Sequence, residues 1–273
     1  MIVISAAAGA FGRLVIERLL TRMPAGEVVA AVRDPVRGAD LAALGVDVRH
    51  GDYDDPASLR SAFRGAERLL LISSPELAPD RRIRQHLAAI DAAGVGGVQA
   101  IAYTSFLGAD RSGEGMNAAH HATERAIIDS GLGYTMLRHP FYSEAFIGTG
   151  LRDAVESGDL VSGTGGRGLN TALRADLAEA AANVLTEDAH LGRGYDLTGP
   201  LWTYPQLAEA LGEATGKKIE YREDADGPSG PMGFLMGLAR SGALERQTDD
   251  LRRVLGRAPT SLRQAVASAL GQG

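Results

Sequence analysis

Short apolar runs alternate with longer stretches of helical periodicity through the first half of the chain. Six runs have the length and composition of buried strands, at residues 2–5, 28–32, 46–49, 68–72, 99–103 and 134–137. Predicted helices lie between them, at residues 13–21, 36–44, 57–63, 81–93 and 118–129. Because these connections are too long for hairpins, we expect parallel strands with right-handed crossovers. The alternation therefore predicts an α/β fold with a doubly wound parallel sheet of the Rossmann type.

The regular alternation ends after Pro140. A glycine-rich stretch follows, and then come predicted helices at residues 175–186 and 205–215 and predicted strands at residues 195–198 and 218–221. We expect two parts from this change of pattern. The first is a Rossmann-type domain at residues 1–140, completed by parts of 170–200, and the second is a smaller α+β lobe at residues 141–273.

The segment at residues 225–245 begins with turn-forming residues and continues as an apolar stretch that contains methionine. This order predicts a lid over a binding site in the smaller lobe. Its adaptable apolar surface would come from Met232, Phe234, Leu235 and Met236. A helix that faces the core of the lobe is the alternative interpretation.

Composition and charge exclude several classes of protein. The 273 residues include no cysteine, which removes disulfides, zinc sites built on cysteine and thiol catalysis. A net charge of −6 argues against a nucleic-acid partner. No run of about 18 apolar residues occurs, and the first residues lack a charged leader, so we expect a cytoplasmic protein without membrane contact. We also expect no metal site and a monomer or homodimer.

The first predicted strand runs directly into a turn of small residues, followed by a helix. Small residues allow the backbone to approach a pyrophosphate, whose charge then faces the helix N-terminus. This position predicts a dinucleotide site. The cofactor-binding residues predicted here are Ala6, Ala8, Gly9, Ala10, Phe11 and Gly12. Simple packing of small residues is the alternative.

The ends of the second and third strands refine the prediction. Arg33 stands where proteins that prefer NAD usually carry an acidic residue toward the ribose, so it favours the 2′-phosphate of NADPH over NADH. Asp52, with Tyr53 beside it, is placed to accept a hydrogen bond from the adenine amine. A solvated Arg33, or one paired with Asp34, and a turn-forming Asp52 are the alternatives.

With these residues in place, the chain resembles the NmrA-like branch of the atypical short-chain dehydrogenase/reductases. It is most similar to the NAD(P)H:quinone oxidoreductases of that branch, over nearly its whole length. The resemblance lies in ISAAAGAFG, VRDP, GDYDDPASL, LLLISSP, AYTSFLGAD, HHATERAIIDSGLGYTMLRHPFYSE, LRADLAEAAANVL and YDLTGPLWTYPQLAEALGEATGKKIEY.

The resemblance implies a position for each part of the cofactor. Gly9 and Gly12 would line the phosphate site, and Arg33 would contact the phosphate on the adenosine ribose. The nicotinamide half would lie along Ile72, Ser73, Ser74, Thr104 and Ser105, and the cleft for the substrate would be bounded by His139, Pro140, Phe141 and Tyr142. One departure concerns the turn, because Ala6 replaces the first glycine of the family pattern Thr-Gly-Ala-Thr-Gly.

A second departure concerns the chemistry. Most short-chain reductases use Tyr-x-x-x-Lys, in which the lysine lowers the pKa of the phenol that protonates the substrate. Here His120 and Glu124 stand at those two positions, while Ser105 matches the usual serine. A substrate that stabilises its own reduced anion does not need the missing acid, and hydride positioning then supplies most of the catalysis. A quinone, or a ketone conjugated to an aromatic ring as in polyketides, has this property.

The predicted catalytic residues are Ser105, Tyr103, His120 and Tyr142, and His121 is a further candidate proton donor. A solvated or structural face is the alternative for the two histidines. Adjacent helical positions diverge by about 100°, so the histidines do not form a metal site. Phe141 and Tyr142 would stack on a flat substrate, with ordinary aromatic packing as the alternative.

The sequence therefore predicts an NADPH-dependent reductase that acts on a planar aromatic quinone or ketone. An NAD(P)-sensing regulatory protein without turnover is the second hypothesis, because the Tyr and Lys are missing. An isomerase or epimerase is less favoured, because such enzymes normally retain that pair.

Overall fold

The computed structural model describes residues 1–148, 150–224 and 230–271. The chain forms two compact units. The first contains Met1–His139 and Leu177–Leu197, and the second contains Pro140–Asp176 and Thr198–Gly273. Each unit is described by itself.

A seven-stranded parallel sheet forms the centre of the first unit. Its strand order is β3-β2-β1-β4-β5-β6-β8. The strands are β1 (Ile2–Ile4), β2 (Val28–Val32), β3 (Asp47–His50), β4 (Arg68–Leu71), β5 (Ala100–Phe106), β6 (Gly133–His139) and β8 (Arg193–Asp196). Every neighbouring pair is parallel, from Ile2 beside Val28 to Arg138 beside Asp196. The predicted doubly wound sheet is confirmed.

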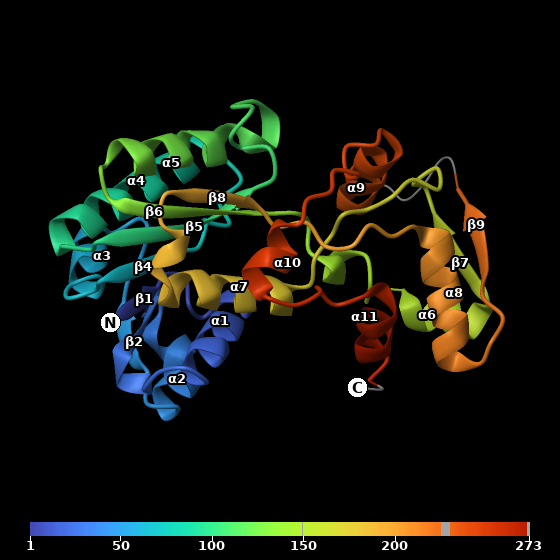
Figure 1. Ribbon diagram of the computed structural model, residues 1–273, viewed down its shortest axis with the longest axis horizontal. Coiled ribbons are helices and arrows are strands. Elements are labelled where there is room, and N and C mark those ends of the chain that lie inside the picture. The colour runs from blue at the N-terminus through green and yellow to red at the C-terminus, as the bar shows by residue number, and fades with distance from the viewer. Residues whose placement is uncertain (149, 225–229, 272–273) are drawn as a thin grey trace. The chain divides into compact units, whose positions relative to one another are not determined.

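Helices cover both faces of this sheet (Figure 1). One face carries α3 (Pro56–Ala62), α4 (Pro79–Gly96) and α5 (Ala118–Asp129), and the other carries α1 (Ala10–Leu20) and α7 (Arg174–Thr186). The short helix α2 (Ala39–Ala43) lies between β2 and β3 in the chain. Because both faces are covered, the central strands are apolar throughout, as the fully buried β2 and β1 illustrate.

The strand order places the topological switch point at β1. The chain moves from β1 to β2 and β3 on one side, and then crosses to β4, β5 and β6 on the other. Ligands of such sheets bind at the carboxyl ends of the strands beside this point. The last strand, β8, follows α7 and pairs with β6, so residues 177–197 return to complete the sheet.

The second unit combines a two-stranded parallel sheet with several helices. The strands are β7 (Asp159–Ser162) and β9 (Glu220–Glu223), and the helices are α6 (Leu151–Ser157), α8 (Tyr204–Thr215), α9 (Gly230–Arg240), α10 (Asp250–Leu255) and α11 (Leu262–Ala269). Strand β7 was not predicted, because its four residues lie in the glycine-rich stretch. Strand β9 begins two residues after the predicted start.

The predicted lid spans α9 and a segment that lies partly outside the described residues, namely residues 225–229. Within α9, Met236 is buried in the apolar core of the second unit, and Met232 and Leu235 pack against that core. Phe234 is exposed. The described part of the segment therefore contains both a core-facing side and an exposed aromatic ring.

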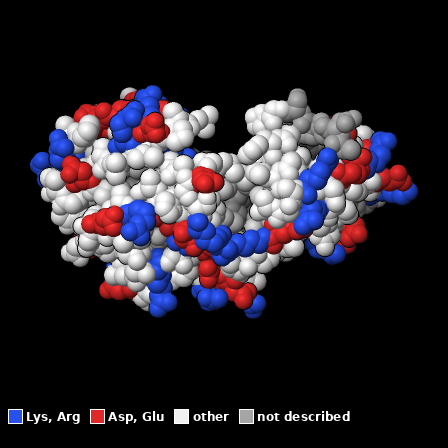
Figure 2. All heavy atoms as spheres, turned by 90° about the horizontal axis from the view of Figure 1, so that it is seen from above, with Lys and Arg blue, Asp and Glu red and all other residues white. Residues whose placement is uncertain are grey.

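Charged side chains of both signs are intermixed on the face shown in Figure 2. This mixture accords with the modest net charge of −6. Within the described ranges, no helix is long and apolar enough to cross a membrane.

One glycine of the second unit marks a very close approach of two backbone segments. A Cβ atom at Gly199 would lie 1.9 Å from the carbonyl oxygen of Thr171. The amide of Gly199 also donates to the carbonyl of Asn170 at 3.1 Å. Any side chain at position 199 therefore requires the two segments to separate.

We predict that Gly199→Ala lowers the free energy of unfolding of the second unit by at least about 3 kcal/mol, because the clash is with backbone. Gly237→Ala is the matched control, since a Cβ at that helical position meets nothing within 4 Å. It should raise stability by up to about 1 kcal/mol. Urea unfolding of both variants checks this, and equal stability of the two would contradict it.

Candidate functional site

The turn after β1 has alanine at position 6, where the family pattern has its first glycine. Ala6 has a φ of +49°, and it is the one non-glycine residue in the described chain with a positive φ. The turn closes when the amide of Gly9 donates to the carbonyl of Ala6 at 3.1 Å, and Ala7 bonds to Ala31 of β2 at 3.2 Å. The sequence thus keeps the glycine-type conformation with alanine, at a cost of about 1 kcal/mol.

Helix α1 begins immediately after this turn. Gly9 is the N-cap and offers no side-chain hydrogen bond, and the first turn contains no acidic residue. The first amides of a helix, such as those of Ala10 and Gly12, have no acceptor within the helix and are suited to bind an anion. A Cβ at Gly12 would lie 2.8 Å from the Cα of Ala7, so glycine at this position allows the helix to start against the turn.

Arg13 braces the turn from the first turn of α1. Its Nε donates to the carbonyl of Ala8 at 3.1 Å, and its Nη2 donates to the carbonyl of Arg37 at 2.6 Å. Its Nη1 forms an ion pair with Asp40. One side chain therefore links the turn to the segment that follows β2.

A cavity of about 530 Å³ opens at the carboxyl ends of β1, β2 and β3. Residues predicted to contact the cofactor line it, namely Ala6, Ala8, Gly9, Arg33, Asp52, Tyr53 and Ser74. The structure therefore brings together turn residues and strand-end residues that are far apart in the sequence. Its size suits a nucleotide portion of a dinucleotide.

Two exposed arginines, Arg33 and Arg37, line this cavity. Neither guanidinium forms an ion pair with a residue that the structure describes. Asp34 instead accepts a hydrogen bond from the amide of Val36 at 3.1 Å and so caps the short helix Pro35–Gly38. Arg37 was not among the predicted site residues, although it follows Arg33 across the same Asp-Pro turn.

The opposite wall of the cavity carries paired charges that the sequence did not indicate. Arg81 contacts Asp54 at 2.9 Å and Glu76 at 3.3 Å, and Gln85 donates to Asp54 at 2.9 Å. The hydrogen bonds from Arg81 and Gln85 hold the pKa of Asp54 below its usual value. Asp52 accepts a hydrogen bond from the amide of Asp54 at 3.0 Å, as a turn-forming aspartate does.

Three successive amides after β4 are each held by a side chain from elsewhere. The amide of Ile72 donates to Oγ of Ser5 at 2.9 Å, and that of Ser73 donates to Oγ1 of Thr104 at 2.8 Å. The amide of Ser74 donates to Nε2 of His86 at 2.9 Å. We call Ser5, Thr104 and His86, with these amides, the polar clamp. These three hydrogen bonds fix the backbone of the loop after β4.

Tyr53 reinforces the polar clamp. Its hydroxyl group lies 2.6 Å from Oγ of Ser5 and donates to the carbonyl of Ile72 at 2.5 Å. Burial raises the pKa of this phenol, although the hydrogen bond with Ser5 opposes the shift. The ring of Tyr53 lines the cavity while its hydroxyl group is committed to the protein.

The predicted catalytic residues of β5 pair with those of α5. Tyr103 and Ser105 lie two apart on the strand, and His120 and Glu124 lie four apart on the helix, so each pair shares one face. The Tyr103 hydroxyl lies 2.9 Å from Nδ1 of His120, and Ser105 donates to Glu124 at 2.6 Å. All four side chains are buried.

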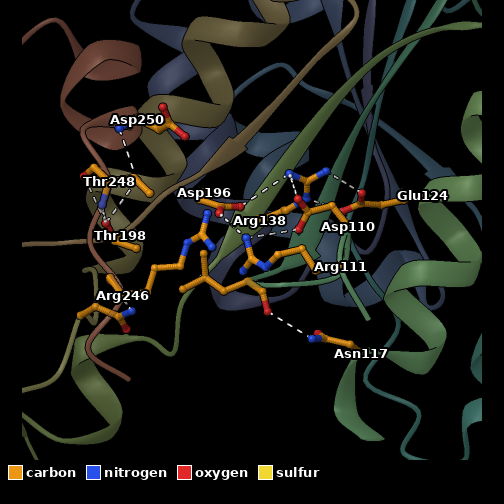
Figure 3. A network of polar contacts seen from close by, with 12 residues as sticks. Asp110, Arg111, Asn117, Glu124, Arg138, Asp196, Thr198, Arg246, Thr248 and Asp250 are labelled. Carbon is orange, nitrogen blue, oxygen red and sulfur yellow. Dashed lines mark hydrogen bonds and ion pairs between the residues drawn. The ribbon is translucent and has the colours of Figure 1, made fainter. Parts of the chain in front are cut away.

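Glu124 belongs to a network of charges at the ends of β5, β6 and β8, in which Glu124 and Asp196 are buried (Figure 3). Arg138 donates to both of its carboxylate oxygens, at 2.9 and 2.8 Å. Asp110 and Asp196 lie 3.5 and 3.6 Å from the same guanidinium. Since Ser105 gives its proton to Glu124, it has only acceptor capacity left for a ligand.

Burial keeps the three core histidines of this unit neutral. It lowers the pKa values of His86, His120 and His139 to about 3. The neighbouring charge of Arg82 acts in the same direction on His86 and His120. Burial also raises the pKa of Tyr103. None of these groups exchanges a proton readily near neutral pH.

The remaining predicted residues are divided between the two units. His139 ends β6 and packs edge-on against Phe11, with ring centroids 5.1 Å apart. Pro140 is buried in the second unit, and Phe141 packs against the core of that unit. The Tyr142 ring lies 4.6 Å from the guanidinium carbon of Arg174. His121 bonds to the carbonyl of Ala109 at 2.7 Å, which is a structural role.

The fold and these contacts define the first unit as a dinucleotide-binding domain. Its uncapped α1, its narrow turn of small residues and its two unpaired arginines fit the phosphates of such a cofactor. A family model described as NAD(P)H-binding matches residues 6–188.

Similar proteins extend this result over the whole chain. Quinone oxidoreductase 2 of Escherichia coli is 40% identical over 282 residues, which cover 98% of each protein. Its structure with NADPH has a TM-score of 0.87 at 38% identity, covering 99% of this chain and 100% of that one. Triphenylmethane reductase of Citrobacter sp., complexed with NADP(H), has a TM-score of 0.92 at 36% identity, covering 98% and 100%.

An NmrA-like family domain-containing oxidoreductase of Aspergillus flavus is 30% identical over 297 residues, covering 98% of this chain and 94% of that protein. The chain therefore belongs to the NAD(P)H-binding family, as an NmrA-like oxidoreductase. The predicted family, the cofactor class and the prediction of an NAD(P)H-dependent oxidoreductase are confirmed.

We predict that Ala6→Gly raises the free energy of unfolding by only about 0–0.5 kcal/mol, because relief of the positive-φ strain of about 1 kcal/mol exceeds or offsets the entropy cost of glycine. Ala8→Gly is the control. Ala8 has no positive φ, so glycine there should lower stability by about 0.5–1 kcal/mol. Urea unfolding measures the stability of both variants. An Ala6→Gly variant that is destabilised as much as Ala8→Gly would show that the backbone at Ala6 is not strained.

Because three histidines are buried in their neutral form, we predict that the protein becomes less stable in mild acid. Their folded pKa values near 3 lie below the unfolded value of about 6.5, so the unfolded chain binds more protons between these pH values. The contribution of the neutral histidines to the free energy of unfolding should be complete above pH ~6.5. Below this pH it should fall by up to about 1.4 kcal/mol per pH unit for each histidine.

Urea unfolding between pH ~7 and ~5 measures this slope. His120→Gln removes one of the three titrating groups and should reduce the slope by about a third. An unchanged slope in this variant would show that His120 does not contribute to the pH dependence of stability.

Proposed function

We propose that the chain is an NADPH-dependent reductase that transfers hydride to the carbonyl group of a quinone or of a ketone conjugated to an aromatic ring. One observation carries the proposal. The two positions of the usual acid–base pair hold His120 and Glu124, and both side chains are bonded inward to β5. Bound NADPH would supply the hydride, and the acceptor must then stabilise the resulting negative charge itself.

The cofactor-binding residues follow from the site. The amides of Ala10, Phe11 and Gly12 would bind the pyrophosphate beside Gly9. Arg33 and Arg37 would bind the 2′-phosphate, which is why we favour NADPH over NADH. Asp52, at the rim of the cavity, would contact the adenine.

The nicotinamide half would lie on the other side of β1, because the adenosine half occupies the cavity beside β2. The loop at residues 72–74, which the polar clamp fixes, would lie along the ribose and the carboxamide. Thr104 would lie below the ring. The residues His139, Pro140, Phe141 and Tyr142 would bound the substrate, with the second unit as a substrate lobe.

The names of similar proteins support the substrate class. The Escherichia coli relative is a quinone oxidoreductase, and the Citrobacter relative acts on triphenylmethane dyes. Both kinds of compound are extensively conjugated, so the charge that changes on hydride transfer is spread over several atoms.

We expect oxidation of NADPH, followed by its near-ultraviolet absorbance, on addition of simple benzoquinones and naphthoquinones. An isolated aliphatic ketone should react far more slowly, because its alkoxide is not stabilised. Binding of NADPH without reduction of any quinone or aromatic ketone would overturn the proposal and favour an NAD(P)-sensing protein.

We predict that Arg33→Gln and Arg37→Gln each weaken NADPH binding by about tenfold or more, since each removes a charge-assisted hydrogen bond. Binding of NADH, which lacks the phosphate, should change little. Arg60→Gln, on exposed helix surface, is the matched control. Fluorescence titration measures the affinities, and equal losses for NADPH and NADH would argue against a 2′-phosphate site.

A further inference from the structure

Arg82 is an isolated cation at the carboxyl end of β4. Its Nη2 donates to Oγ of Ser73 at 3.0 Å, and its Nε is buried without a hydrogen-bond partner among the described residues. It forms no ion pair with any described carboxylate. Its side chain is partly buried, and this burial lowers its pKa.

Other partly buried arginines of this unit have carboxylate partners. Arg13 pairs with Asp40, Arg68 pairs with Asp188, and Arg138 contacts Glu124 at 2.8 Å. A partly buried charge without a counter-ion is costly to keep, which is a reason to consider a functional role for it. Among the described residues, Arg82 is the partly buried arginine of this unit that has no carboxylate partner.

The groups around Arg82 are neutral. Its charge acts on His86, His120 and Tyr103, and none of these is ionised near neutral pH. Ser73, its hydrogen-bonding partner, follows β4 and is held by Thr104 of β5. The guanidinium therefore lies among uncharged groups on the side of β1 that we assign to the nicotinamide and the acceptor.

We propose that Arg82 stabilises the anion that forms when the acceptor is reduced, and so favours neutral acceptors over cationic ones. This inference rests on the proposed reductase function. A neutral quinone that gains a hydride becomes a hydroquinone monoanion, while the reductant becomes NADP⁺. A proton from water then completes the hydroquinone. Arg82 keeps its own proton throughout and acts only by charge and hydrogen bonding.

A cationic triphenylmethane dye provides the contrasting case. Its central carbon gains the hydride and forms a new C–H bond, which yields a neutral product and NADP⁺. A fixed positive charge nearby opposes entry of the dye and gives the product no advantage. The two acceptor classes should therefore respond to Arg82 in opposite directions.

The experiment compares Arg82→Gln, which removes the charge, with Arg82→Lys, which retains it. We expect Arg82→Gln to lower kcat for naphthoquinone at least tenfold, to leave the affinity for NADPH unchanged, and to leave or raise the rate with a cationic dye. Arg82→Lys should recover much of the quinone rate. Arg84→Gln, an exposed change on the same helix, is the matched control.

A second measurement does not depend on turnover. The coloured anion of 2-hydroxy-1,4-naphthoquinone reports its own ionisation when it is titrated with protein and NADP⁺. The wild-type protein should lower the apparent pKa of the bound quinone by about one unit, and Arg82→Gln should abolish that shift. Thermal unfolding of the same variant tests its fold.

Equal losses with both acceptors, or a bound-quinone pKa that is the same in both proteins, would overturn the role of Arg82. Failure of the wild-type protein to reduce any quinone would instead refute the proposed function, and the titration would still test Arg82.

Discussion

The polar clamp is the interaction on which the carboxyl edge of the sheet depends. Three consecutive amides after β4 donate to three side chains, one directly after β1, one in β5 and one in α4. Unpaired amides at this depth would cost about 1–3 kcal/mol each, so the clamp fixes the loop while it satisfies the backbone. The loop therefore cannot rotate these amides outward without losing the three hydrogen bonds.

The clamp also determines the protonation state of His86. Thr123 donates its proton to the carbonyl of Ala119 at 2.6 Å, so it must accept from Nδ1 of His86, at 2.8 Å. The other ring nitrogen accepts from Ser74. Only the neutral imidazole with its proton on Nδ1 satisfies both contacts. The hydrogen bonds of His86 therefore require a neutral ring beside Arg82. The low pKa of His86 agrees with this.

Much of the fold was predictable because its signals are local. The strand–helix alternation, the small-residue turn and Arg33 can each be recognised within a few residues. The strand β7 and the return of β8 to the main sheet were harder, because short strands acquire their partners only in the tertiary structure. The positive φ of Ala6 was also not predictable, since alanine gives no indication of the conformation that its neighbours impose.

The site was predictable as a set of residues but not as a set of contacts. Tyr103, Ser105 and His120 were all identified, yet their commitment to one another and to Glu124 depends on the packing of α5 against β5. Arg37 and Arg82 were missed because exposed and isolated arginines look alike in sequence. What distinguishes Arg82 is that no carboxylate of the described residues forms an ion pair with it, which only a three-dimensional structure reveals.

The polar clamp also has a consequence for how the protein is made. Its contacts join residues 67 and 31 positions apart, and His86 is in turn held by Thr123, 37 positions later. A nascent chain that has emerged only as far as α4 still lacks Thr104, which holds the amide of Ser73, and Thr123, which bonds to His86. We therefore expect the β4 loop to become ordered late in synthesis, after α5 has left the ribosome, whereas the turn at Ala6 and helix α1 need only the first strands.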